Sequence, residues 1–310
     1  MSRGSRITGY GTALPERVIT NHDLAETLDT SDTWITERTG IKERRIGGST
    51  RSLAIDAGQR ALQMSGLPAE SLDAIILATT TPDRVIPATA SSVQTSLGAR
   101  CGAFDLNAAC SGFVYGLNVA HGLILAGAEN VLLIGSETLS RFVDWEDRAT
   151  AVLFGDGAGA VVISATPAED NALLSWALDC NGELEKSLYC DFGRFIYMEG
   201  REVFRQAVRI MVATCERALA SAGLGTTDVN LVVPHQANAR IIQSACERLG
   251  ISEDQTVQVL SWTGNTSSAS IPLGLADAAA GGRLRAGDIV LLVGFGAGMT
   301  AASALMRWEL

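Results

Sequence analysis

The chain has 310 residues, of which 47% are hydrophobic and 19% are charged, a balance that can bury a large core and excludes an intrinsically disordered protein. Its formal net charge of −10 argues against a protein that binds nucleic acid or an anionic membrane surface. Its apolar runs are too short to span a bilayer and its first ten residues lack the apolar stretch of an export signal, so we expect a cytoplasmic protein.

Two helix–strand pairs repeat along the chain and indicate a duplicated unit. Residues 60–67 match residues 217–224, and both copies predict a helix that ends at a glycine. Each helix is followed by an apolar run rich in β-branched residues, at 74–79 and at 229–233, which predicts a buried strand. The repeat therefore predicts an α/β fold whose two parts share one plan.

A glycine-rich sequence also occurs twice, at residues 155–159 and 294–298. Each copy predicts two strands joined by a tight turn. An NAD-binding protein is the weaker interpretation, because the dinucleotide-binding glycine motif opens a helix. Together the repeats predict two similar halves, residues 1–164 and 165–310, and no flexible linker separates them.

Cys110 lies at a predicted turn between a short strand, residues 103–106, and a long helix, residues 113–126. The thiol then faces the positive end of the helix dipole, which predicts a pKa below the free value of about 8.5. Small neighbours such as Ala109 and Ser111 leave room for a substrate. Cys110 is therefore a candidate nucleophile, and a structural thiol beside a turn is the alternative.

The three histidines have different sequence contexts. His22 lies in a pattern typical of a capping box, and His121 falls within a predicted buried helix, so both have structural explanations. His235 follows the apolar strand at 231–233, and open α/β sheets bind ligands at the carboxyl ends of their strands. His235 is therefore a candidate site residue.

Asn265 lies in a polar stretch, residues 263–270, before a predicted apolar helix at 272–280. This pattern is typical of an Asx turn and a helix N-cap. On residue type and spacing alone, a structural role is favoured for Asn265 over a functional one.

Five sequence blocks, in order, belong to a match that runs over nearly the whole chain. They are Ser31-Asp32-x-Trp34-Ile35-x-x-Arg38-Thr39-Gly40-Ile41, Ala108-Ala109-Cys110-Ser111-Gly112-Phe113, Phe154-Gly155-Asp156-Gly157-Ala158-Gly159-Ala160, Pro234-His235-Gln236-Ala237-Asn238 and Gly264-Asn265-Thr266-Ser267. Each block alone is moderately specific for one protein family, and all five in this order are highly specific for it. Together they resemble the β-ketoacyl-acyl-carrier-protein synthase III family, the initiating enzymes of type II fatty acid synthesis.

The resemblance implies a thiolase-like fold, a five-layered α-β-α-β-α sandwich of two duplicated halves, in agreement with the repeats. It also implies a homodimer. The implied reaction is a decarboxylative Claisen condensation of an acyl-CoA starter with malonyl-acyl carrier protein. The reaction needs neither a metal nor a redox cofactor, and the cysteines and histidines lack the spacing of a metal site.

Roles for individual residues follow from the same resemblance. Cys110 forms the acyl thioester, and the backbone N–H groups of Cys110 and Ala297 form the oxyanion hole. His235 and Asn265 donate hydrogen bonds to the enolate that remains when the malonyl group loses CO₂.

The resemblance also implies a CoA site near the N-terminus. Trp34 and Arg148 sandwich the adenine, and Arg38 contacts the phosphates. Lys42 stands where the family often has arginine, and a lysine cannot form a bidentate phosphate contact.

Carrier proteins are acidic, so a chain with a net charge of −10 needs a local basic surface to bind one. Arg201, Arg205 and Arg209 recur every four residues on a predicted helix. We expect Arg205, together with Arg240 and Arg248, to dock the carrier. A merely solvated helix face is the alternative.

The size of the starter is predicted from one loop. By resemblance, residues 79–87 reach across the dimer and close the partner's acyl pocket, and a bulky aromatic residue before the proline restricts that pocket to acetyl groups. Ile86 occupies this place. Because each buried CH₂ contributes about 0.8 kcal/mol where room exists, we expect acetyl-CoA or somewhat longer starters, of about four to six carbons.

Other functions stay open. A polyketide or other secondary-metabolite starter ketosynthase, or an acyltransferase that does not condense, has the same fold and the same triad. A catalytically inactive acyl-binding relative is a further alternative, and the intact set of Cys110, His235 and Asn265 argues against it.

Overall fold

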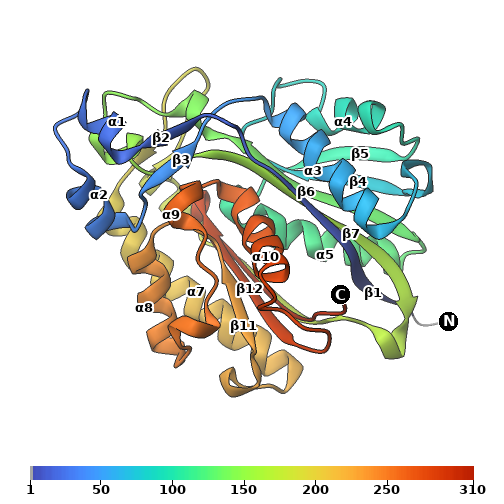
Figure 1. Cartoon of the computed structure of the whole chain (residues 1–310). Coiled ribbons are helices and arrows are strands. Elements are labelled where there is room, and N and C mark those ends of the chain that lie inside the picture. The colour runs from blue at the N-terminus through green and yellow to red at the C-terminus, as the bar shows by residue number, and fades with distance from the viewer. Residues whose placement is uncertain (1–2) are drawn as a thin grey trace.

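Two β-sheets form the centre of the fold in the computed structural model, which describes residues 3–310 (Figure 1). The first sheet contains β1 (Arg3–Ala13), β4 (Ala74–Ala78), β5 (Gly102–Leu106), β6 (Asn130–Thr138) and β7 (Asp156–Pro167). The second contains β8 (Leu173–Cys180), β11 (Leu231–Pro234), β12 (Ile289–Gly296) and β13 (Thr300–Arg307). Their strand orders are β1-β7-β6-β4-β5 and β11-β12-β13-β8.

Four strands of each sheet share the same order and directions. β4 and β6 are parallel, and β7 is antiparallel to both β6 and β1. In the second sheet β11 and β12 are parallel, and β13 is antiparallel to both β12 and β8. This recurrence supports the predicted two halves. The boundary after residue 164 stays a prediction, and β7 runs across it.

Helices cover both sheets and fill the space between them (Figure 1). In order through the layers they are α3 (Thr50–Ser65) and α4 (Thr89–Leu97) on the first sheet, α5 (Gly112–Leu125) and α10 (Ser270–Ala280) in the middle, and α7 (Gly200–Ala222) and α8 (Ala239–Leu249) on the second sheet. The predicted α-β-α-β-α sandwich is confirmed. No helix in residues 3–310 is long and apolar enough to cross a membrane.

The middle layer holds the largest core. Phe113 and Leu117 of α5 are buried together with Ile76 of the first sheet and Leu292 of the second. A helix that contacts a sheet on each side needs apolar residues around most of its circumference, and α5 has them. Because α5 is fixed from both sides, the turn that precedes it has a rigid support.

Shorter elements lie at one end of the sandwich. They are β2 (Val18–Thr20), β3 (Glu43–Arg45), β9 (Leu188–Tyr189), β10 (Tyr197–Met198), α1 (Asn21–Ala25), α2 (Asp32–Thr39), α6 (Arg148–Ala151) and α9 (Leu260–Thr263). The capping box predicted around His22 is confirmed, since Thr20 and Asp23 cap α1 reciprocally.

The structure confirms the predicted helix ends but corrects one glycine-rich turn. α3 ends at Gly66 and α7 at Gly223, both in the left-handed conformation with φ of 71° and 68°. Residues 294–298 lead from β12 to β13 as predicted, but the residues before Gly155 form helix α6 instead of a strand. Asp147 caps this helix. Short apolar runs do not distinguish a buried helix from a strand, so the prediction was wrong there.

Candidate active site

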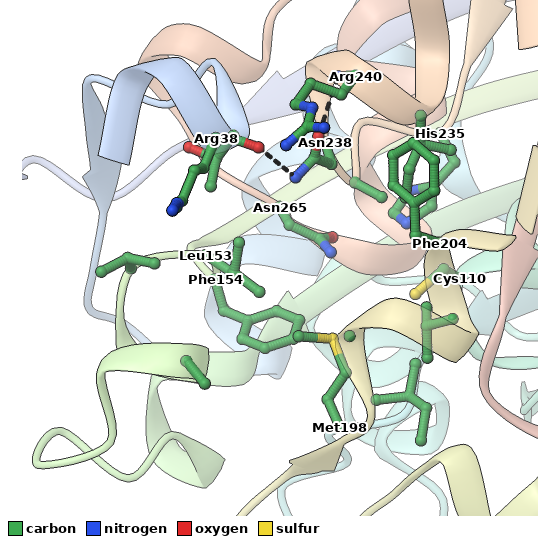
Figure 2. A pocket seen from close by; sticks show the side chains of 18 of the residues that line it. Arg38, Cys110, Leu153, Phe154, Met198, Phe204, His235, Asn238, Arg240 and Asn265 are labelled. Carbon is green, nitrogen blue, oxygen red and sulfur yellow. Dashed lines mark hydrogen bonds between the residues drawn. The ribbon is translucent and has the colours of Figure 1, made fainter. Parts of the chain in front are cut away.

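Three side chains from distant parts of the chain line one cavity of about 540 Å³. Cys110 lies in a short helix, Ala109–Ser111, between β5 and α5, His235 directly follows β11, and Asn265 lies between α9 and α10. Figure 2 shows the Cys110 sulfur, the His235 ring and the Asn265 amide around the same space. The structure thus brings together the three residues predicted as the catalytic set.

Cys110 lies at the N-terminal end of α5 as predicted, but its pKa is not lowered. Burial raises the pKa of the Cys110 thiol to about 12, with a smaller decrease from the Ser267 hydroxyl and a smaller increase from the Glu137 carboxyl. No cation contributes, so only hydrogen bonding from the Ser267 hydroxyl and from the backbone opposes the loss of solvation. The prediction of a pKa below about 8.5 is therefore wrong.

The end of β12 lies directly against the Cys110 turn. A Cβ added at Gly296 would lie 2.5 Å from the Cys110 backbone nitrogen and 2.8 Å from the Ala109 Cβ, so this close approach requires glycine. Ala297 is the next residue and begins the turn toward β13. The N–H groups of Cys110 and Ala297 therefore belong to two segments in contact, which is the arrangement an oxyanion hole needs.

His235 is buried, and its neighbours orient the ring. Its backbone N–H donates to the Val293 carbonyl (2.7 Å), and its Nδ1 lies 2.7 Å from the Ser270 Oγ. Ser270 Oγ also accepts a hydrogen bond from the Gln236 N–H (3.2 Å), and no other acceptor among the described residues is within reach of the Ser270 proton. That proton therefore points to Nδ1, which places the ring proton on Nε2. Burial lowers the pKa of His235 to about 3, so the ring is neutral at physiological pH.

Asn265 is held at both its backbone and its side chain. Its N–H donates to the Leu153 carbonyl (2.9 Å), and its carbonyl accepts from the Gly155 N–H (3.0 Å). Its Oδ1 accepts from the Ser267 N–H (2.9 Å). The Asx turn considered for this segment is thus present, and because it occupies the amide oxygen, it leaves the NH₂ group as a donor.

Trp34 and Arg38 line the cavity, and Figure 2 shows Arg38 at the end away from Cys110. The guanidinium carbon of Arg38 is 4.5 Å, and that of Arg148 is 4.8 Å, from the centre of a Trp34 ring. Arg148 also donates to the Asp29 carbonyl (2.7 Å). The three residues predicted to bind CoA therefore form one cluster.

Two family models match this chain. The model described as 3-oxoacyl-[acyl-carrier-protein (ACP)] synthase III matches residues 104–182, and the model of its C-terminal part matches residues 219–308. The β-ketoacyl-[acyl-carrier-protein] synthase III of Roseiflexus castenholzii is 49% identical over 100% of this chain and 99% of its own length. The chain belongs to the β-ketoacyl-acyl-carrier-protein synthase III family.

Solved structures agree with this assignment. The 3-oxoacyl-[acyl-carrier-protein] synthase III of Aquifex aeolicus VF5 superposes with a TM-score of 0.96 at 46% identity, over 98% of this chain and 100% of that one. The priming β-ketosynthase of the R1128 polyketide pathway superposes with a TM-score of 0.95 at 33% identity, over 99% and 97%. The predicted family, the thiolase-like fold and the condensing acyltransferase activity in fatty acid synthesis are thereby confirmed.

The arginines predicted to dock the carrier are all exposed in this synthase III family member, but their surroundings differ. Arg205 forms an ion pair with Glu202 (2.7 Å), which neutralises much of its charge. Arg240 and Arg201 line the cavity, whereas Arg248 lies at the far end of α8. Among the arginines of α7 and α8, Arg201 and Arg240 therefore lie nearest the cavity, which Arg38 of α2 also lines.

Ile86 does not line the cavity of its own chain. It lies in the loop between β4 and α4, and 83% of its surface is exposed. Only a second chain could bring Ile86 to an acyl pocket, so its role stays a prediction.

Sequence reasoning missed several residues around the site. Apolar side chains form much of the cavity wall, among them Leu188, Met198, Phe204 and Phe295. Ser270 holds His235, and it follows the Asn265 block closely enough to have been considered. Glu137 was also missed. An acidic residue near the end of an apolar strand, residues 130–138, is unusual in a protein interior and could have indicated a functional residue.

Proposed function

We propose that this family member transfers an acyl group from acyl-CoA to Cys110 and then condenses it with a malonyl group on an acyl carrier protein, using no metal or redox cofactor. The observation that carries the proposal is the convergence of one thiol and two hydrogen-bond donors, His235 and Asn265, on a single cavity. The mouth of that cavity carries the positive charge that CoA phosphates and an acidic carrier need.

In the first stage, the Cys110 sulfur attacks the thioester carbonyl and CoA leaves as a thiol. The negative charge on the carbonyl oxygen is stabilised by the N–H groups of Cys110 and Ala297. Each such donor contributes on the order of 3 kcal/mol to the transition state. The contact between Gly296 and the Cys110 turn supports this pairing.

In the second stage, the malonyl group loses CO₂ and an enolate forms on the thioester oxygen. The His235 Nε2–H and the Asn265 NH₂ group donate to that oxygen. Both are neutral donors, and a neutral imidazole suits this role because it polarises the oxygen without transferring its proton. The enolate carbon then attacks the acyl-Cys110 thioester and releases a 3-ketoacyl product.

CoA binding requires a change at Trp34. An adenine stacked between Trp34 and Arg148 needs about 7 Å between its two neighbours, since each stacking contact takes about 3.5 Å. Arg148 now lies 4.8 Å from the Trp34 ring and is held at Asp29. Arg148 therefore moves outward when the adenine enters, and Arg38 remains to contact the phosphates.

The proposal includes a homodimer in the cytoplasm, in which Ile86 of one chain closes the acyl pocket of the other. The exposed position of Ile86 supports this arrangement. A polyketide starter synthase is the second candidate, because the R1128 priming β-ketosynthase superposes with a TM-score of 0.95. Its sequence identity to this chain, 33%, is lower than the 46% and 49% of the two synthase III relatives, so the first candidate is favoured.

Intact-protein mass spectrometry tests the proposal. The full chain is mixed with acetyl-, butyryl- and hexanoyl-CoA, and an acyl adduct is expected on the wild type and not on Cys110→Ala, since a methyl group forms no thioester. An adduct that persists on the alanine variant would show that Cys110 is not the nucleophile. Addition of malonyl-acyl carrier protein should then discharge the wild-type adduct as a 3-ketoacyl product.

A further inference from the structure

A carboxyl group that the two-stage reaction does not use lies buried close to Cys110. Glu137 is the penultimate residue of β6 and has no exposed surface. It accepts hydrogen bonds from the Thr81 hydroxyl (2.7 Å), the Ser268 hydroxyl (2.8 Å) and the Thr80 N–H (3.1 Å). Within residues 3–310, no arginine, lysine or histidine forms an ion pair with it. A buried carboxyl group without a cation is costly, so its presence calls for an explanation.

Ser267 lies between this carboxyl group and the nucleophile. Its hydroxyl is buried and forms no regular hydrogen bond with the described residues. Its segment, Ser267–Ala269, packs against both the Cys110 turn and strand β6, which carries Glu137. Its φ of 48° is left-handed and therefore strained for a residue other than glycine. The hydrogen bond from the Ser267 N–H to Asn265 holds it in that conformation.

The first stage needs a group that takes the thiol proton, and His235 is unsuited to the task. Ser270 occupies its Nδ1, its Nε2 already carries a proton, and burial lowers its pKa to about 3. Burial raises the pKa of Cys110 to about 12, so the thiol still holds its proton when a substrate arrives at neutral pH.

We propose that Glu137 accepts the proton of the Cys110 thiol in the first stage, and that the Ser267 hydroxyl passes it on. The inference rests on the proposed role of Cys110. As the sulfur electron pair forms the bond to the thioester carbon, the thiol proton moves to the Ser267 oxygen and the Ser267 proton moves to Glu137. The bond to the CoA sulfur then breaks, and the proton returns by the same route to the departing CoA thiolate. Cys110 is left as an acyl thioester, and Glu137 as a carboxylate.

The charge balance of the site suits such a transfer. Burial raises the pKa of Glu137, and hydrogen bonds from Thr81, Ser268 and Thr80 partly offset the increase. A charged Glu137 opposes a Cys110 thiolate. When one proton moves from the Cys110 thiol to Glu137, one of the two groups is charged and the other is neutral, so the pair carries a single negative charge throughout.

Other charged groups are turned away from Glu137. The segments packed against it, on the β4–α4 loop and before α10, present neutral hydroxyls and an amide. The titratable group that faces it is the Cys110 thiol. Arg141 contacts the Thr81 carbonyl (2.6 Å) and lies 3.8 Å from Asp83, so its charge is directed toward that carboxylate.

The test measures acyl-enzyme formation by rapid quench and intact mass, using the full chain and acetyl-CoA from pH 6 to pH 9. Glu137→Gln keeps the size of the side chain and should slow acylation at pH 7 by about 100-fold, the usual contribution of a general base. Wild-type acylation should fall as pH decreases through the raised pKa of Glu137, because a protonated carboxyl cannot accept, and the glutamine variant should lack this fall. Ser267→Ala should slow acylation in the same direction, and Glu137→Asp should restore part of the rate.

Glu129→Gln, at an exposed carboxyl paired with Arg3, is the matched control and should acylate like the wild type. Decarboxylation of malonyl-CoA should change less than threefold in Glu137→Gln, since it needs no thiol proton transfer. If Glu137 is only an unfavourable charge, Glu137→Gln and Ser267→Ala will acylate as fast as the wild type or faster, which overturns the inference. Should Glu137→Gln fail to fold, Ser267→Ala still decides, because it leaves the hydrogen-bond donors to Glu137 in place. An acyl adduct on Cys110→Ala would instead overturn the proposed function.

Discussion

Substitution of Gly296 by alanine should separate the two stages of the reaction. The Gly296 backbone is extended, with φ of −164°, so alanine adopts it without strain. The obstacle is contact, because the new Cβ would lie 2.5 Å from the Cys110 nitrogen, and that neighbour is backbone that cannot rotate away.

The size of the effect follows from that contact. To reach an ordinary separation of 3.4 Å from 2.5 Å, the Cys110 turn must move by about 0.9 Å relative to β12. A misplacement of about 1 Å in a reacting group costs about 100-fold in rate, or about 2.7 kcal/mol. We therefore expect acylation of Cys110 to fall by about two orders of magnitude in Gly296→Ala. Malonyl decarboxylation should fall much less, since the atoms nearest the added Cβ belong to Ala109 and Cys110 and not to His235 or Asn265.

Rapid-quench acylation with acetyl-CoA and a separate decarboxylation assay measure the two stages. Gly122→Ala is the matched control, because Gly122 lies on α5 with no atom within 4 Å of an added Cβ, and alanine there should stabilise the helix by about 0.5–1 kcal/mol. Acylation by Gly296→Ala within threefold of the wild type would refute the reasoning, and equal losses in both assays would indicate general damage to the site.

Three further changes test single residues. His235→Ala should slow malonyl decarboxylation by about 100-fold or more and acylation far less, and equal losses would mean that His235 serves the thiol instead. Arg240→Glu should raise the KM for malonyl-acyl carrier protein several-fold, with a clear salt dependence, and should slow acylation by acetyl-CoA much less, because Arg38 remains to contact the CoA phosphates. Arg248→Glu, at the far end of α8, is the comparison, and identical KM values for wild type and Arg240→Glu would place docking elsewhere. Ile86→Phe should narrow the acyl-CoA range of kcat/KM toward acetyl-CoA, and an unchanged preference would show that Ile86 does not set the pocket.

The sequence alone was enough for the family, the layered fold and the three residues at the centre of the site. Cys110 lies between a strand and a helix and His235 ends a strand, and these positions follow from local periodicity, which nearby residues determine. The order of the five blocks identified the family, and reading that order needs no three-dimensional information. The two predicted halves rest on the repeats and agree with the shared strand order, whereas their boundary after residue 164 stays a prediction, because β7 runs across it.

The tertiary structure decided what the site residues can do, because their chemistry depends on neighbours that are distant in the chain. The local helix predicts a low pKa for Cys110, but burial against Gly296 and near Glu137 raises it. Nothing in the sequence near His235 indicates Ser270, which is 35 residues away and orients the ring. Desolvation and hydrogen-bond partners arise only when separate segments pack together, so the sequence names the reacting groups and the fold determines their protonation and direction.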